Sequence, residues 1–352
     1  MTETAKRVAI TTLVVVGIVV VALALWKLRL VVGLLFAAMI IAAALRPSID
    51  WLGRHHVPRP AGLLLHYAAL AALIGVGIAF AAPAALHQVD HALSPSGKAE
   101  IAHAAKHSSG VKHELLTAVQ KRLRHLPTKS QLIKPATQIG LKAFEVLIGF
   151  FFTFAAAAYW IFERDKTVDV VCSLIPRPKR KRVRDTWTLI DLRLGAFVRG
   201  QVLLILAVAT ALSLLFWAIG EPYWILVGSF AGLVEIIPVI GPLSAGVLAI
   251  GVGLTASVQV AVLAAGCVLL VRVTEDYLVM PKVLGEAVGL SPLLVLVSVT
   301  TVGILFSGWA VLFAVPIAAV AVTLFDVVLR NVDPAEEETP AVIFSPKEAE
   351  AG

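Results

Sequence analysis

Charged residues are scarce in this sequence. They make up 15% of its 352 residues, whereas 59% of the residues are hydrophobic. An ordinary soluble domain is about a quarter charged and about half apolar. No compact soluble fold could bury so much apolar surface, so the composition excludes an ordinary soluble protein and predicts an integral membrane protein.

Cysteines and catalytic motifs are also scarce. Cys172 lies in a basic segment and Cys267 inside an apolar run, and two such cysteines exclude a disulfide framework and a thiolate metal site. The sequence contains no P-loop, no H-E-x-x-H and no G-x-S-x-G. We therefore expect a protein that is not an enzyme and that needs no cofactor.

The hydrophobic residues are gathered into long runs. Runs of about 20 apolar residues, enough to cross a bilayer, occupy 8–26, 28–45, 61–85 and 141–162. The C-terminal half is apolar almost throughout, but turn residues interrupt it at 220–222, 238–242, 281 and 307–309. We predict an all-α, polytopic helical membrane protein with about eight membrane segments, including at least one re-entrant hairpin.

These runs divide the chain into six regions. We predict three N-terminal spans in 1–85, a small helical extracytoplasmic domain in 86–140, a fourth span in 141–162, a basic cytoplasmic loop in 163–195, a C-terminal core of broken helices in 196–330 and a disordered cytoplasmic tail in 331–352. The tail is acidic and contains prolines, a composition that cannot bury enough apolar area to fold alone.

The net charge of +7 comes from basic residues that lie between the apolar runs. That placement is typical of membrane topology and argues against a nucleic-acid partner. The densest basic run comprises Arg177, Lys179, Arg180, Lys181, Arg182 and Arg184. Because Lys and Arg near span ends favour the cytoplasmic side, we place this run and both termini in the cytoplasm. The same residues can bind anionic lipid headgroups, or they can serve only to set the topology.

Two short apolar arms of about 15 residues surround the turn at Pro238, Gly241 and Pro242. Each arm is short for a full crossing, so we predict a re-entrant hairpin whose turn points toward a polar pathway. A second hairpin can turn at Ser307 and Gly308, although its arms are also long enough to be ordinary spans. A repeat of span and hairpin is how many secondary transporters build a site in the membrane.

Several polar residues interrupt the apolar C-terminal half. Glu235 would cost about 2.5 to 3.5 kcal/mol to insert, so it either carries a proton or braces the hairpin tip. Arg272, Glu275 and Asp276 are spaced i, i+3 and i+4 on one helix face, where they form either a cation or proton site or an interfacial salt bridge. Gln201 can hydrogen-bond across helices.

Histidines are concentrated in the predicted extracytoplasmic domain. Six of the nine lie there: His87, His91, His103, His107, His113 and His125. Two pairs have the i, i+4 spacing that can chelate a metal on a helix, but no carboxylate or cysteine completes a ligand set. We favour solvated helix faces and predict no metal site.

Seven motifs occur in the order found in one family of bacterial transporters. They are YWIFERD at 159–165, IP at 175–176, RGQ at 199–201, GEPY at 220–223, EIIPVIGP at 235–242, PKVLG at 281–285 and the segment 303–316. By these motifs the chain resembles the autoinducer-2 exporter family, also described as PerM-like permeases.

The resemblance implies a transporter of the bacterial inner membrane that forms homo-oligomers, among which pentamers are expected. Its implied function is ion-coupled export or exchange of a small solute, such as a signalling molecule of the autoinducer-2 type. A sodium/proton antiporter, an oligomeric pore and a membrane scaffold are the alternatives.

Overall fold

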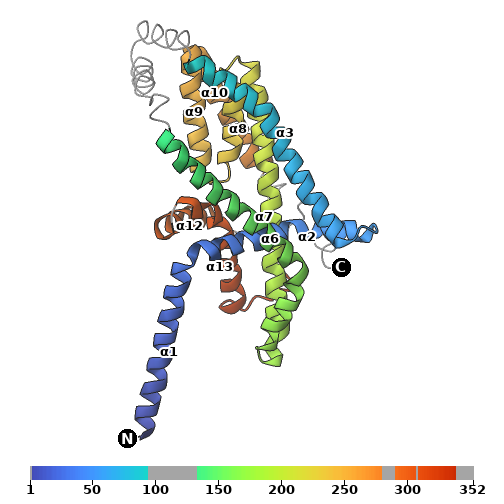
Figure 1. Ribbon diagram of the computed structural model, residues 1–352, viewed down its shortest axis with the longest axis vertical. Helices are drawn as coiled ribbons and strands as arrows, with labels where there is room; N and C mark the ends of the chain where they lie inside the picture. The colour runs from blue at the N-terminus through green and yellow to red at the C-terminus, as the bar shows by residue number, and fades with distance from the viewer. Residues whose placement is uncertain (1, 94–132, 280–289, 307, 338–352) are drawn as a thin grey trace.

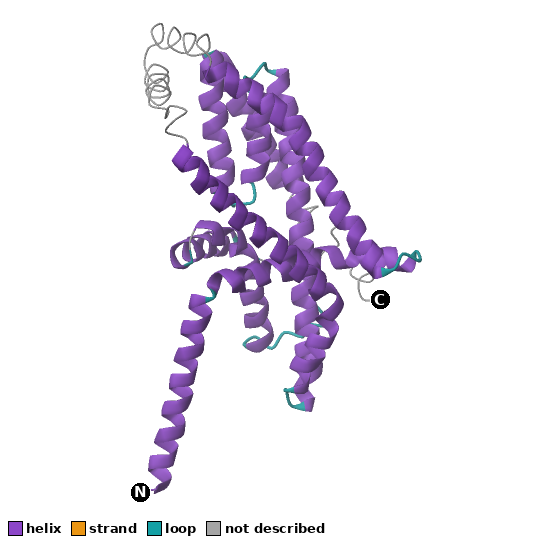
Figure 2. Ribbon diagram, viewed as in Figure 1, coloured by secondary structure: helices purple, strands orange, loops and turns teal. Residues whose placement is uncertain are grey.

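The computed structural model describes residues 2–93, 133–279, 290–306 and 308–337, and every regular element in these ranges is a helix (Figure 2). Seven of the described helices are long and apolar enough to cross a membrane, and three shorter apolar helices accompany them. The predicted class, a polytopic helical membrane protein, is confirmed.

The N-terminal third consists of α1 (Thr2–Lys27), α2 (Arg29–Arg54) and α3 (Arg59–Leu93). Helix α1 projects from the rest of the molecule (Figure 1), and its apolar side chains are exposed. Helix α2 instead packs through buried alanines, because Ala38 and Ala42 meet Ala157 of the following helix α6. These small residues allow two helices to approach closely within a membrane.

Helices α6 (Ile133–Ser173) and α7 (Arg177–Ala218) contain 41 and 42 residues. At 1.5 Å per residue each is about 60 Å long, roughly twice the hydrocarbon thickness. The predicted basic loop 163–195 is therefore not a loop: it is helical except around 174–176. Lys and Arg are good helix formers, and Pro178 near the start of α7 is compatible with a first helical turn.

The predicted extracytoplasmic domain lies mostly outside the described residues. Helix α3 continues to Leu93 and α6 begins at Ile133, so both flanks of that region are helical. Four of its histidines, in 103–125, are outside the described part of the chain.

Helix α7 ends in a glycine-based cap. Gly220 has φ +73°, and its N–H donates to the carbonyl of Trp217 at 3.2 Å, while Glu221 N–H donates to Phe216 O at 2.9 Å. This pair of bonds satisfies the carbonyls that a helix leaves unpaired at its C-terminus. The cap turns the chain back along the C-terminal half of α7.

Three helices then gather beside that half of α7 (Figure 1): α8 (Trp224–Val234), α9 (Ile240–Ala256) and α10 (Val258–Thr274). Helix α10 begins at a serine cap, because Ser257 Oγ accepts from Val260 N–H at 3.1 Å. It continues into the π-helical turn η2 (Glu275–Val279). The shared interior of α7, α8, α9 and α10 is apolar and is centred on fully buried Phe216.

Helices α8 and α9 form the hairpin that the sequence predicts. With 11 and 17 residues they are about 16 and 25 Å long, shorter than the roughly 30 Å hydrocarbon core. Helix α8 packs on α7 through two glycines. A Cβ on Gly228 would lie 2.7 Å from Ser213 Cα, and one on Gly232 would lie 2.8 Å from Ala209 N. Because both positions are glycine, α8 can pack closely against α7.

The last membrane segment comprises α12 (Pro292–Leu305), η3 (Gly308–Phe313) and α13 (Ala314–Val328). The first arm, α12, is short for a crossing, whereas Gly308–Val328 is long enough to span. Its turn packs on the junction of α1 and α2, where Trp26 and Phe306 have ring centroids 5.8 Å apart.

The first residues after α13 lie against α7. Arg193 Nη2 contacts Glu337 Oε2 at 2.6 Å, and Arg182 Nη1 donates to Asn331 Oδ1 at 3.3 Å. The predicted disordered tail therefore begins later than residue 331, because arginines of α7 pair with this stretch. Residues 338–352 are outside the described ranges.

Candidate functional site at the tip of the α8–α9 hairpin

The turn between α8 and α9 has a strained backbone. Ile240 N–H donates to Pro238 O at 2.7 Å, which closes a three-residue turn around Val239. Val239 has φ 67° and ψ −52°, a conformation that a β-branched residue adopts only at a cost of about 1–3 kcal/mol. The surrounding packing must hold this turn in place.

Gly241 allows the two arms to meet at the tip. A Cβ at this position would collide with the carbonyl oxygen of Val234 and would lie 3.2 Å from Glu235 Cα. Pro242 follows in the first turn of α9, where a helix needs no N–H donor. The structure thus places Pro238, Gly241 and Pro242 together at the tip, as predicted.

Four charged side chains meet beside this turn. Arg272 on α10 lies 3.1 Å from Glu235 Oε1 and 3.3 Å from Glu275 Oε2 through Nη1. Its Nη2 lies 2.9 Å from Asp276 Oδ1. The Glu235 and Glu275 side chains are 8% and 5% exposed, whereas Asp276 is 44% exposed. We call these four residues the tip cluster.

The tip cluster contains more acidic than basic groups. If all four were ionised, three carboxylates and one guanidinium would leave a net charge of −2. Buried charge is costly unless it is paired, and one arginine cannot neutralise three carboxylates. The arrangement is therefore suited to take up a cation or a proton.

Gln201 connects α7 to the tip cluster. Its Nε2 donates to the backbone carbonyl of Glu235 at 3.1 Å. That carbonyl lies at the C-terminus of α8, where helix carbonyls lack partners. The predicted hydrogen bond across helices is confirmed, and it fixes the tip against the long helix.

A model of the AI-2E family of transporters matches residues 12–330, a range that includes the hairpin and the tip cluster. The chain belongs to this family. It is 23% identical over 296 residues to the Bacillus subtilis protein YrrI, covering 81% of this chain and 83% of YrrI. It is 25% identical over 308 residues to MT0215 of Mycobacterium tuberculosis, covering 83% of this chain and 82% of that protein. Both relatives are named as candidate transport proteins.

One predicted site residue of this AI-2E family member does not join the tip cluster: Gly308 begins η3. Ser307 lies outside the described residues. Trp309, directly after Gly308, packs on α2 so closely that a Cβ on Gly33 would lie 2.6 Å from its ring. The second turn is therefore built around aromatic packing on α2.

The basic run of this transporter lies in the first two turns of α7. Three of its arginines hold neighbouring segments: Arg180 donates to Ile175 O at 2.8 Å, Arg182 to Asn331 Oδ1, and Arg184 to Asp169 Oδ1 at 2.6 Å. All six basic residues of the run are exposed. Binding of anionic lipid headgroups by this run stays a prediction.

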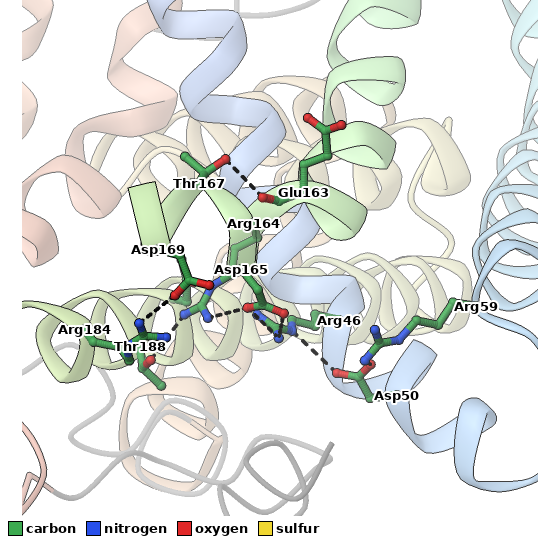
Figure 3. Close-up of polar contacts among 11 residues, drawn as sticks. Arg46, Asp50, Arg59, Glu163, Arg164, Asp165, Thr167, Asp169, Arg184 and Thr188 are labelled. Atoms are coloured by element: carbon green, nitrogen blue, oxygen red, sulfur yellow. Dashed lines mark hydrogen bonds and ion pairs between the residues drawn. The ribbon is translucent and has the colours of Figure 1, made fainter. Parts of the chain in front are cut away.

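A second charged group, absent from our sequence predictions, joins α2, α6 and α7 (Figure 3). Arg164 Nε lies 2.8 Å from Asp191 Oδ2 and Nη1 lies 2.9 Å from Asp165 Oδ1, which Arg46 also contacts at 3.3 Å. These residues follow the apolar part of α6 and precede that of α7. Both side chains of the Arg164–Asp191 pair are largely buried, with exposures of 11% and 15%.

Proposed function

We propose that this protein is a secondary transporter of the bacterial inner membrane that exports or exchanges a small solute, and that the tip cluster couples this movement to an ion gradient. The observation that carries the proposal is the sharing of Arg272 among Glu235, Glu275 and Asp276 at the end of a re-entrant hairpin. The protein would not be an enzyme. A signalling molecule of the autoinducer-2 type is the first solute to test, on the strength of the family.

Ion binding can change the balance of contacts in the tip cluster. When a cation or proton neutralises one carboxylate, Arg272 can pair fully with the others. When the ion leaves, repulsion between the buried Glu235 and Glu275 opposes the closed arrangement. An ion shifts a conformational equilibrium only if it binds one state better than the other. The hairpin tip, which is already strained at Val239, is the element that we expect to move.

We infer that both termini lie in the cytoplasm, because the basic start of α7 favours that side. Arg177, Lys179 and Lys181 would then contact anionic lipid headgroups, at about 1 kcal/mol for each charge. The same orientation places the Gly220 end of α7 on the outer side of the membrane. We further propose a homo-oligomer, with a pentamer as the expected form.

A sodium/proton antiporter is the second candidate function. The excess of carboxylates over Arg272 favours it, since such a group can exchange one cation for another without an organic solute. An oligomeric pore and a scaffold are separate outcomes of the same flux measurement.

The test uses the purified full chain in proteoliposomes with an imposed pH or sodium gradient. The probes are autoinducer-2 and a small-metabolite mixture, and mass spectrometry measures what the vesicles accumulate. We expect saturable, gradient-dependent flux that Glu235→Gln reduces at least tenfold. Glu163→Gln, an exposed carboxylate on α6, is the matched control and should transport normally.

Each alternative gives a different result. Sodium/proton exchange without solute would identify the antiporter, single-channel currents a pore, and no flux of any probe a scaffold. Full rate and unchanged ion dependence in Glu235→Gln would refute coupling at the tip cluster.

A further inference from the structure

Glu221 occupies a position that ordinarily holds an apolar side chain. In the glycine cap that ends α7, the residue after the glycine donates its N–H to the helix, and its side chain usually packs on the last apolar turn. Here that residue is Glu221, which donates to the carbonyl of Phe216 at 2.9 Å. The cap therefore turns a carboxyl group into the interior of the α7–α10 bundle.

The carboxyl group of Glu221 is buried and unpartnered. The residue is 2% exposed, and neither Oε1 nor Oε2 has a hydrogen-bond partner among the described residues. The bundle closes tightly around it: a Cβ on Gly253 of α9 would lie 3.0 Å from Glu221 Oε2 and 2.8 Å from Ala261 Cα of α10. An ionised carboxylate without a partner is far more costly in such a place than a neutral acid.

No described side chain hydrogen-bonds to the Glu221 carboxyl group. Helix α3 contacts α8, and its His66 and Tyr67 side chains bond to Gly62 O and Phe154 O instead. Helices α8 and α9 contain no titratable residue, nor does α7 between Val202 and its end. On α10, Cys267 packs against the apolar core of the bundle, and Tyr223 lies two residues after Glu221 in the chain. Arg272 lies 11 residues, about 16 Å, beyond Ala261 on α10 and is engaged in the tip cluster.

We propose that Glu221 is a second proton-binding site, which holds its proton while the Gly220 end of the bundle is closed and releases it when that end opens to water. The ligand is a proton because Glu221 supplies a single carboxyl group, and no described side chain beside it completes a set of metal ligands. The step is a simple exchange with water: the carboxylate gains or loses one proton.

Glu221 and the tip cluster lie at opposite ends of the same bundle. Helix α10 runs 17 residues, about 25 Å, from Ser257 near Gly253 to the carboxylates of η2. A proton-binding group at each end gives each side of the membrane its own titratable site. This inference deepens the proposed ion coupling, but the site at Glu221 can be measured without transport.

The test is infrared difference spectroscopy on the full chain in lipid nanodiscs, titrated from acid to alkaline pH. A protonated carboxyl group has its own carbonyl band, whereas an ordinary glutamate is more than about 99% ionised at pH 7. We expect the wild-type protein to retain such a band at pH 7, and the difference between wild type and Glu221→Gln to show a component that belongs to Glu221. Glu163→Gln should leave the band unchanged.

A second pair of variants keeps Glu221 in place. Gly253→Ala should separate α9 from α10 and admit water. In a titration toward alkaline pH, the Glu221 band should then disappear at least one pH unit earlier than in the wild type, which is a tenfold higher proton concentration. Gly251→Ala, with open space around its Cβ, should not shift it. A band that Glu221→Gln and Gly253→Ala both leave unchanged, or the absence of any such band at pH 7, would overturn the proposal. The spectrum is independent of flux, so failure of ion coupling in vesicles would be a separate result.

Discussion

Replacing Gly241 by alanine tests the geometry of the hairpin tip directly. A Cβ at Gly241 would collide with Val234 O and lie 3.2 Å from Glu235 Cα, so the first turn of α9 must move away from the end of α8. Overpacking of this kind costs about 1–3 kcal/mol. The shift would also carry Glu235 away from Arg272, whose Nη1 lies 3.1 Å from its carboxylate.

Gly251→Ala supplies the matched control in the same helix. No atom lies within 4 Å of a Cβ at Gly251, so this variant gains helix stability of about 0.5–1 kcal/mol without a collision. The helix gain applies to both variants, so they should differ by about 1–3 kcal/mol in the free energy of unfolding, with Gly241→Ala the less stable. Equal chemistry at both positions removes the intrinsic effect of alanine from the comparison.

The assay is reversible unfolding in mixed micelles, followed by solute flux in proteoliposomes. Gly241→Ala should lose most of its transport at temperatures where it is still folded, while Gly251→Ala should transport like the wild type. If Gly241→Ala were as stable as Gly251→Ala and equally active, the contact between the two arms would not exist as described.

Two further substitutions test other parts of the fold. Val239→Gly should relieve the positive-φ strain, so the free energy of unfolding should stay the same or rise by up to about 1–3 kcal/mol. Transport should nevertheless be slower, because the tip is less well fixed. Denaturation and flux measured on one preparation test both effects, and faster transport would contradict the reasoning. Arg164→Gln should cost about 3 kcal/mol at neutral pH by leaving Asp191 buried without its arginine. Asp191→Asn should restore much of this loss, because it removes the carboxylate that lacks its arginine; a double variant no more stable than Arg164→Gln would exclude this cause.

The tip cluster was partly visible in the sequence. Arg272, Glu275 and Asp276 share a helix face by spacing alone, and short arms around Pro238 indicate a hairpin. The contact between Arg272 and Glu235 joins positions 37 residues apart, which no local pattern encodes. It follows from the packing of α8, α9 and α10, which only the structure provides.

Two features were not predicted: the helices that continue through 163–195 and the burial of Glu221. The dense charge of 163–195 suggested a loop, although Lys and Arg favour helices and two long helices continue through it. Glu221 stood between Gly220 and Pro222, so it was taken as part of a turn. Its burial depends on the cap that directs its side chain inward.

The unbroken length of α7 gives the protein a lever. From Arg177 to Ala218 it spans about 63 Å, so a tilt of about 10° around its centre would displace each end by about 5 Å, nearly one helical pitch. Its basic N-terminal end is held by the residues after α13 and by Arg164, whereas its other half packs against α8 and, through Gln201, contacts the tip. A force on the basic end of α7, from a lipid headgroup or a neighbouring subunit, would therefore displace the tip of the α8–α9 hairpin, because α7 is one continuous helix.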